Sequence, residues 1–188
     1  GSFLLNGEKY HAADLFAEGA DGKQRATVLI SKKANLISET NPLTEITADN
    51  GNIKSITYAT TGEGAEQKTV ATLVVEANGD EATYELTVGF KPDFTLTYYD
   101  ADGKTVLGTQ AVEQDAEIEK FLDGITEKVT VADGKKFRGW ASDQKKDSQK
   151  FPTSSVITEN AALYALVTDI ETASGTARYD YDLQKEGF

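Results

Sequence analysis

The sequence predicts a mostly β protein of two domains, and three observations lead to this prediction. Glycine is plentiful at 16 of 188 residues, threonine is abundant, and long segments with helical periodicity are few. Short runs of β-branched and aromatic residues alternate with polar residues between turn sequences. Lys91-Pro92-Asp93 interrupts this pattern, because proline cannot donate to a strand ladder. We therefore expect domains over residues 1–91 and 92–168, followed by a tail over residues 169–188.

The first domain is expected to be a small, β-sandwich-like domain. Asn6-Gly7 separates two short runs within residues 3–10 and is a strong signal for a type I′ hairpin turn. Residues 11–16 predict a short helical turn, and residues 26–30 predict a strand. Residues 36–46 are ambiguous between a turn and a short helix.

The clearest hairpin of this domain lies near its C-terminal end. Residues 68–77 and 81–90 both alternate apolar and polar side chains, and Asn78-Gly79-Asp80 closes the turn between them. Residues 53–60 also predict a strand, but their apolar side chains do not fall on one face, so its register stays open. Several short strands at this spacing favour a sandwich.

The second domain is expected to contain two hairpins and one short helix. The alternation in residues 94–99 places Tyr98 on one face of a strand and Tyr99 on the other. Residues 116–129 carry apolar side chains at helical spacing. Further strands are expected at residues 105–110, 134–140 and 163–167.

Three motifs of this second domain occur in a fixed order. They are the tyrosine-ended strand Phe94–Tyr99, the sequence Phe137-Arg138-Gly139-Trp140, and the final segment Ala162–Val167. In this order they resemble the internalin-type B-repeat, also called the Listeria–Bacteroides repeat. The resemblance implies a β-grasp-like module of bacterial surface and secreted proteins. The chain departs from the family pattern after Trp140 and at Leu166-Val167, which affects any shared ligand surface but not the core.

The resemblance also implies a role. We expect a non-catalytic module that acts as a spacer or an adhesive interaction domain, extracellular or at the cell surface. The alternative is a glycan-binding accessory domain of a polysaccharide-degrading enzyme. A protein or glycan surface ligand is the expected partner in either case. Gly1-Ser2 and the lack of methionine suggest a piece of a longer precursor, whose downstream domain would be a further partner.

The composition argues against several other roles. The formal net charge is −12 at pH 7, spread over both predicted domains and the tail, and such a surface repels nucleic acid. There are no cysteines, which excludes disulfides and thiolate metal sites. No apolar run approaches the ~18 residues of a membrane-spanning helix, so no membrane span is expected.

No catalytic or metal site is predicted. His11 is the only histidine, and no nucleophile motif accompanies it. Asp100-Ala101-Asp102-Gly103 begins like a calcium loop, but Ala111 stands where a bidentate glutamate is required, so a hairpin turn is expected. With one histidine and no cysteine, zinc has no ligand set. We therefore expect no enzyme activity, no metal and no cofactor.

Aromatic side chains are the remaining candidates for ligand binding, because an exposed flat ring can stack on the apolar face of a sugar. Tyr99 is the best candidate, since Tyr98 shares the apolar face of its strand and Tyr99 does not. Trp140, Tyr179 and Tyr181 are the others. For Trp140, a packing role in the core is favoured over a role in ligand binding.

Overall fold

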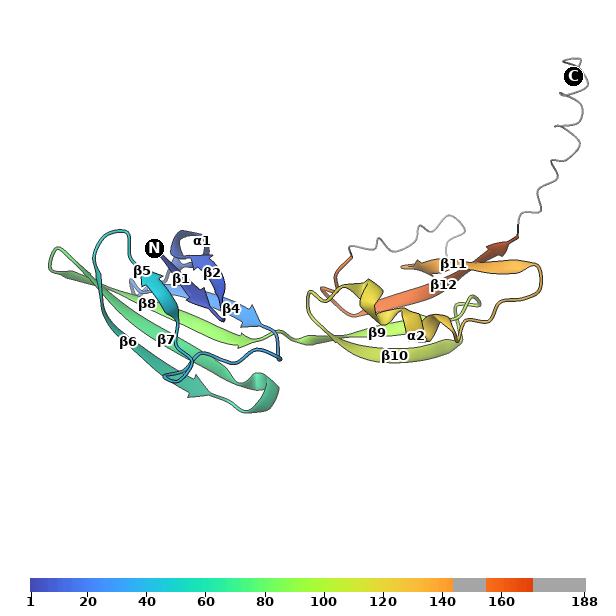
Figure 1. Cartoon of the computed structure of the whole chain (residues 1–188), viewed down its shortest axis with the longest axis horizontal. Helices are drawn as coiled ribbons and strands as arrows, with labels where there is room; N and C mark the ends of the chain where they lie inside the picture. The colour runs from blue at the N-terminus through green and yellow to red at the C-terminus, as the bar shows by residue number, and fades with distance from the viewer. Residues whose placement is uncertain (144–154, 171–188) are drawn as a thin grey trace, which may run out of the picture. The chain divides into compact units, whose positions relative to one another are not determined.

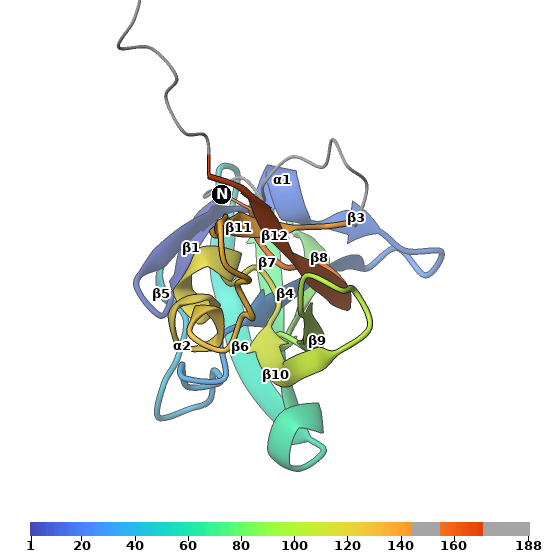
Figure 2. The ribbon, with the colours of Figure 1, turned by 90° about the vertical axis from the view of Figure 1, so that its right-hand side faces the viewer.

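The computed structural model describes residues 1–143 and 155–170. Within these residues the protein is mostly β, as predicted, with a few short helical segments (Figures 1 and 2). The chain divides into two compact units, Gly1–Pro92 and Asp93–Phe188. This division falls inside the predicted linker.

The N-terminal unit, all of which is described, consists of two sheets and two short helical segments. In chain order its elements are β1 (Ser2–Leu5), β2 (Glu8–His11), α1 (Ala12–Leu15), β3 (Ala17–Glu18), β4 (Gln24–Ile30), β5 (Thr44–Thr47), β6 (Asn52–Thr61), the 3-10 helix η1 (Gly64–Glu66), β7 (Lys68–Ala77) and β8 (Asp80–Phe90). One sheet has the strand order β3-β4-β8-β7-β6 and the other has the order β2-β1-β5. Neighbouring strands are antiparallel except β4 and β8, which are parallel.

The two predicted hairpins of this unit are confirmed. Asn6 and Gly7 have φ angles of 50° and 84°, and Asn78 and Gly79 have φ angles of 55° and 90°. Two consecutive residues with positive φ are what a type I′ turn requires, and asparagine and glycine adopt this conformation most readily. Local turn chemistry therefore fixes the β1–β2 and β7–β8 pairings.

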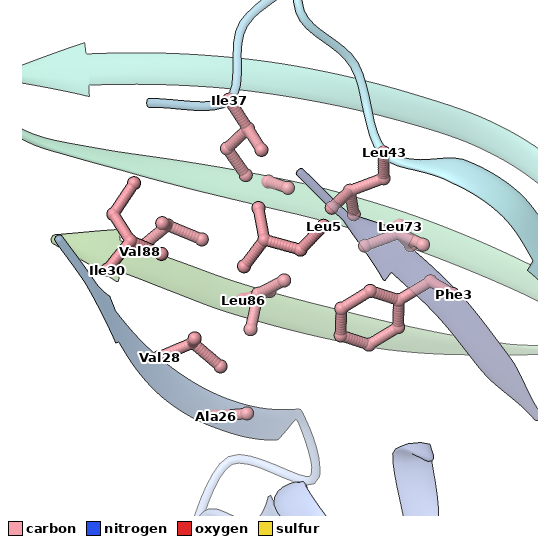
Figure 3. Packing of buried hydrophobic residues seen from close by; sticks show 11 residues of the cluster. Phe3, Leu5, Ala26, Val28, Ile30, Ile37, Leu43, Leu73, Leu86 and Val88 are labelled. Carbon is pink, nitrogen blue, oxygen red and sulfur yellow. The ribbon is translucent and has the colours of Figure 1, made fainter. Parts of the chain in front are cut away.

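The core of the N-terminal unit lies between its two sheets (Figure 3). Phe3 and Leu5 of β1 face Leu86 of β8 and other buried side chains of the larger sheet. Ile37 and Leu43, from the segment that the sequence left ambiguous, complete the core between the sheets. Residues 36–43 form a loop in which only these two side chains are buried, so the segment has neither strand nor helix periodicity.

The open register of residues 53–60 also has a structural cause. β6 pairs with β7 along its whole length, but the register shifts between Ile53 and Ser55. A β-bulge of this kind adds one residue to one strand and reverses the alternation beyond it. Ile56 and Tyr58 then point to the core, whereas Ile53 precedes the bulge.

The C-terminal unit contains one sheet and a helical segment on one of its faces. Its described elements are β9 (Asp93–Tyr99), β10 (Val106–Glu113), the 3-10 helix η2 (Ile118–Phe121), α2 (Asp123–Thr126), β11 (Lys135–Ala141) and β12 (Ala161–Asp169). The strand order is β10-β9-β12-β11. The first and last strands, β9 and β12, are parallel neighbours in the centre, and each forms an antiparallel pair with an outer strand.

Two details differ from the prediction for this unit. The single helix expected in residues 116–129 is a 3-10 turn followed by a short α-helix, with Ile118 buried and Ile125 partly buried against the sheet. Gly124 in the second segment disfavours a longer helix. The last strand extends to Asp169, whose carboxylate lies 2.9 Å from the ammonium of Lys135, so it enters the predicted tail.

Candidate interaction site

Trp140 is a core residue of the C-terminal unit. Its side chain is 3% exposed, and its ring meets Tyr98 and Phe137 edge-on, with ring centroids 5.6 and 5.7 Å away. The indole nitrogen donates a hydrogen bond of 3.1 Å to the hydroxyl of Thr126. Trp140 therefore offers no ring face to a ligand, which corrects its inclusion among the ligand-binding candidates and agrees with the favoured packing role.

Tyr98 is buried beside this indole. Its hydroxyl donates a 3.0 Å hydrogen bond to the backbone carbonyl of Phe121, which ties the central strand to the helical segment. Burial raises the pKa of the Tyr98 phenol, because the low-dielectric core disfavours the charged form. The alternation predicted from the sequence is thus correct for this strand, with Leu96 and Tyr98 inside.

Tyr99 lies on the opposite face of the sheet and is partly exposed. It stacks on Tyr164 of the neighbouring strand, with ring centroids 5.0 Å apart and ring planes 16° from parallel. The parallel register of β9 and β12 places these two residues side by side. Tyr164 is not among the candidates predicted from the sequence, although the burial of Leu163 and Ala165 follows the alternation that turns Tyr164 outward.

This pair belongs to a row that crosses the sheet. Val106 of β10 is the partner of Tyr99 in the ladder and is 52% exposed. On the other side, Tyr164 is paired with Ala141 of β11, which is buried. We call Val106, Tyr99 and Tyr164 the aromatic row. Residues of this kind on a sheet face that points away from the core form an apolar strip on the outside of the unit.

Threonine lies beside the aromatic row on the same face. Thr97 of β9 is two residues from Tyr99, and its ladder partner on β10 is Thr109. Both side chains point away from the core, because directly paired residues share a face of the sheet. The site thus combines stacked phenol rings, one aliphatic side chain and hydroxyl groups. Such a surface can form apolar contacts and hydrogen bonds, but it supplies no nucleophile activated by a base.

The other two predicted aromatic candidates, Tyr179 and Tyr181, lie outside the described residues.

The acidic turn considered as a calcium loop is held by internal hydrogen bonds. The Asp102 carboxylate accepts bonds from the Thr105 hydroxyl at 2.6 Å and from the backbone amides of Thr105 and Lys104, each at 2.8 Å. These bonds lower the pKa of Asp102 to about 2. The buried Asp100 accepts bonds from the amides of Ala101 and Thr130, and so fastens this turn to the segment after α2.

The carboxylates elsewhere do not assemble into a metal site in the part of the chain that is described. No group of three His, Asp or Glu side chains there has a geometry that could hold a metal ion. His11 ends β2 at the start of α1, and its side chain is exposed and does not cap that helix.

A cavity of about 260 Å³ in the N-terminal unit was not foreseen from the sequence. It lies between the sheets and is lined largely by apolar side chains, among them Phe3, Phe16, Ile46 and Leu86, with Asp49 also contributing. Small-molecule sites typically enclose ~300–1,000 Å³ and contain several converging polar groups. At about 260 Å³ this cavity lies below that range, and its lining combines apolar side chains with the polar Ser2, Thr47, Asp49, Asn50 and Tyr84.

Comparison with known proteins adds no family to these observations. No protein-family model matches the chain, and no curated protein matches it. Among the described residues, no helix is long and apolar enough to cross a membrane.

Proposed function

We propose that this chain is a non-catalytic module of a bacterial surface or secreted protein, and that it acts as a spacer and adhesive interaction domain. The aromatic row of the C-terminal unit is its contact surface. The observation that carries the proposal is the partly exposed stack of Tyr99 on Tyr164, next to the exposed Val106.

The proposal rests on where these side chains lie. A sheet with one face on the core normally carries polar residues on its other face, and the neighbouring Thr97 and Thr109 follow this pattern. The aromatic row departs from it at three neighbouring positions. Tyrosine is enriched at protein interfaces, because its ring contributes a large contact area at a low cost in conformational entropy. An interaction surface accounts for this departure.

The chain topology supports the β-grasp-like part of the proposal. The C-terminal unit has the order hairpin, helical segment, hairpin, and its first and last strands are parallel in the centre of the sheet. This is the arrangement that the resemblance to the B-repeat family implies. The N-terminal unit contributes two sheets around one core, as a sandwich-like domain would.

The geometry of the stack favours a protein ligand over a glycan. Tyr99 and Tyr164 cover one ring face each by stacking on one another. They stand on neighbouring strands, where side chains rise roughly perpendicular to the sheet and present ring edges and hydroxyls outward. A sugar that stacks needs a flat, open ring face. A glycan-binding accessory role is the second candidate function, in which the outer hydroxyls of this face would contact the sugar.

A bead-adhesion experiment tests the proposal. Beads coated with the full chain are applied to a panel of bacterial and cultured animal cells, and the same chain is applied to a glycan array. We expect adhesion that falls at least fivefold in the double variant Tyr99→Ser/Tyr164→Ser and is retained in Thr27→Ser, a change at an exposed position of the N-terminal unit. A glycan-array signal lost in the same double variant would establish the glycan alternative. Adhesion that the double variant leaves unchanged would overturn the assignment of the aromatic row.

A further inference from the structure

β6 forms an open edge of the larger sheet in the N-terminal unit. It is ten residues long, and among the described residues its strand partner in this sheet is β7 (Figure 1). Within residues 1–143 and 155–170, the other side of its backbone therefore has no strand partner. Exposed edges of this length present a row of free amide and carbonyl groups that can pair with another strand.

Proteins usually protect such edges, and the other outer strands of this chain show how. β11 carries Lys135, Lys136 and Arg138, and charged side chains on an edge oppose strand addition. β2 and β5 are only four residues long, and β3 only two. β10 lies beside the helical segment, where Ile125 approaches within 3.1 Å of the position that a Cβ on Gly108 would take.

β6 lacks these protections over most of its length. From Ser55 to Thr61 it reads Ser-Ile-Thr-Tyr-Ala-Thr-Thr, without a charge, proline or glycine. Such β-branched and aromatic runs of low charge have the highest tendency to form intermolecular strands. The strand's only charged residue, Lys54, forms ion pairs with Glu81 of β8 and Glu76 of β7. Its ammonium is therefore directed across its own sheet and away from the open edge.

We infer that β6 is a self-association site, where it pairs antiparallel with β6 of a second copy of this chain. A two-fold axis through Tyr58 would place Ser55 opposite Thr61, Ile56 opposite Thr60, and Thr57 opposite Ala59. This register uses all seven residues of the uncharged run from Ser55 to Thr61 and keeps core-facing residues on one side of the joined sheet. It brings no two like charges together within the ladder.

The occupant is a second copy because the run from Ser55 to Thr61 carries no charge, so two identical strands can pair without opposing like charges. Each copy carries formal charge −12, but the ladder is neutral and more distant charges are screened within about 8 Å at physiological salt. A single strand edge is small beside the ~1,200–2,000 Å² of stable interfaces, so the dimer is weak. The site lies in the N-terminal unit and does not depend on the proposed function of the aromatic row.

Sedimentation equilibrium of the full chain tests this site. At 0.15 M salt, with loading from about 10 μM to about 1 mM, we expect the average mass to rise from 20.3 kDa toward twice that value. The variant Thr57→Lys/Ala59→Lys places lysine opposite lysine twice, so we expect it to stay monomeric with an unchanged melting temperature. The control Thr27→Lys/Leu29→Lys adds the same charges at the same spacing on the exposed face of β4 and should dimerise like the parent. A parent chain that stays monomeric up to about 1 mM, or a β6 variant that still dimerises, would overturn the inference.

Engineered cysteines test the register independently, because the natural chain has none. Directly opposed residues of an antiparallel pair have Cα atoms ~4.5–5.5 Å apart, which is within disulfide range. A mixture of Thr57→Cys and Ala59→Cys chains should therefore form a cross-linked dimer under mild oxidation at least fivefold more than either chain alone. Equal cross-linking in the mixture and in the single chains would contradict the register centred on Tyr58. If unrelated extended peptides bound the β6 edge as tightly as a second copy of the chain does, the choice of a second copy as the partner would be contradicted.

Discussion

The indole nitrogen of Trp140 on β11 lies 3.1 Å from the hydroxyl of Thr126 at the end of α2. The same Thr126 hydroxyl lies 2.7 Å from the backbone carbonyl of Leu122 and donates to it. The Thr126 hydroxyl thus accepts a hydrogen bond from Trp140 on the sheet and donates one to the preceding helical turn. This connection fixes the helical segment over the face of the sheet where Tyr98 and Trp140 meet.

Replacing Trp140 by alanine should destabilise the C-terminal unit by about 3–5 kcal/mol, because it removes a large buried ring and leaves a cavity. Urea unfolding followed by amide NMR signals measures this loss. The matched variant Thr126→Val keeps the ring but leaves the indole N–H without its partner, and should cost about 1–3 kcal/mol. An unchanged midpoint for Trp140→Ala would show that this side chain is not part of the packing.

The stacking of Tyr99 on Tyr164 should appear as a coupling energy. In a double-mutant cycle with Tyr99→Ala and Tyr164→Ala, the loss of stability in the double variant should be about 0.5–1.5 kcal/mol smaller than the sum of the two single losses. Each single replacement already removes the stacking energy, which aromatic pairs gain beyond area burial. Trp140 is the only tryptophan, so its fluorescence reports the unfolding of this unit. Strictly additive losses would show that the two rings do not interact in solution.

The acidic turn should make the C-terminal unit sensitive to low pH. The pKa of Asp102 is about 2 in the folded chain, below its ordinary value of 3.8, because the carboxylate accepts bonds from Thr105 and Lys104. A lowered pKa contributes stability above the unfolded value, and this contribution is lost as pH falls through the folded value. The melting temperature should therefore be steady above about pH 5 and fall between about pH 4 and pH 2.

Asp102→Asn is the variant that isolates this contribution. It should melt lower than the parent at neutral pH and show a shallower decline on acidification. Asp100 contributes to the same loss of stability at low pH. Burial alone would raise the pKa of its carboxyl, but hydrogen bonds from Thr130 and Ala101 outweigh burial and hold the pKa below its ordinary value. Parallel pH profiles for parent and Asp102→Asn would refute the role assigned to this carboxylate.

Two glycines of the same unit should respond to alanine with opposite signs. Gly134 has a φ of +75°, where an alanine is strained, and no atom lies within 4 Å of its added methyl group. We expect Gly134→Ala to cost about 1 kcal/mol from backbone strain alone. Gly124 lies in α2, has no positive φ and also has open space around it, so Gly124→Ala should stabilise by up to about 1 kcal/mol. Urea midpoints from Trp140 fluorescence measure both, and equal signs would contradict the assigned backbone conformations.

The two compact units should fold separately. A fragment of residues 93–170 should give a dispersed amide spectrum and retain the melting transition that Trp140 fluorescence shows in the full chain. We choose residue 170 because β12 extends to Asp169 and the Ile170 amide donates to the carbonyl of Gly134. A fragment with collapsed amide dispersion would contradict the independence of this unit.

Features set by neighbouring residues were predictable from the sequence, whereas features set by distant pairing were not. Asn78-Gly79 specifies its turn locally, so the β7–β8 hairpin could be predicted. Ile37 is a core residue in a loop, and only the sheets that close over it reveal this role. Tyr99 could be recognised as outward-facing, but its partner Tyr164 is 65 positions away, and their contact depends on the parallel register of β9 and β12.

That central parallel pair determines how the C-terminal unit would bear a pulling force. β9 begins the described unit and β12 ends it, and the two run side by side in the same direction. Tension applied at opposite ends of the unit therefore acts along both strands and loads the hydrogen bonds between them in shear. Bonds loaded in shear must break together, whereas those of a hairpin pulled open at one end break one after another. A unit with this connectivity would resist extension until a high threshold force, and its length would then change abruptly.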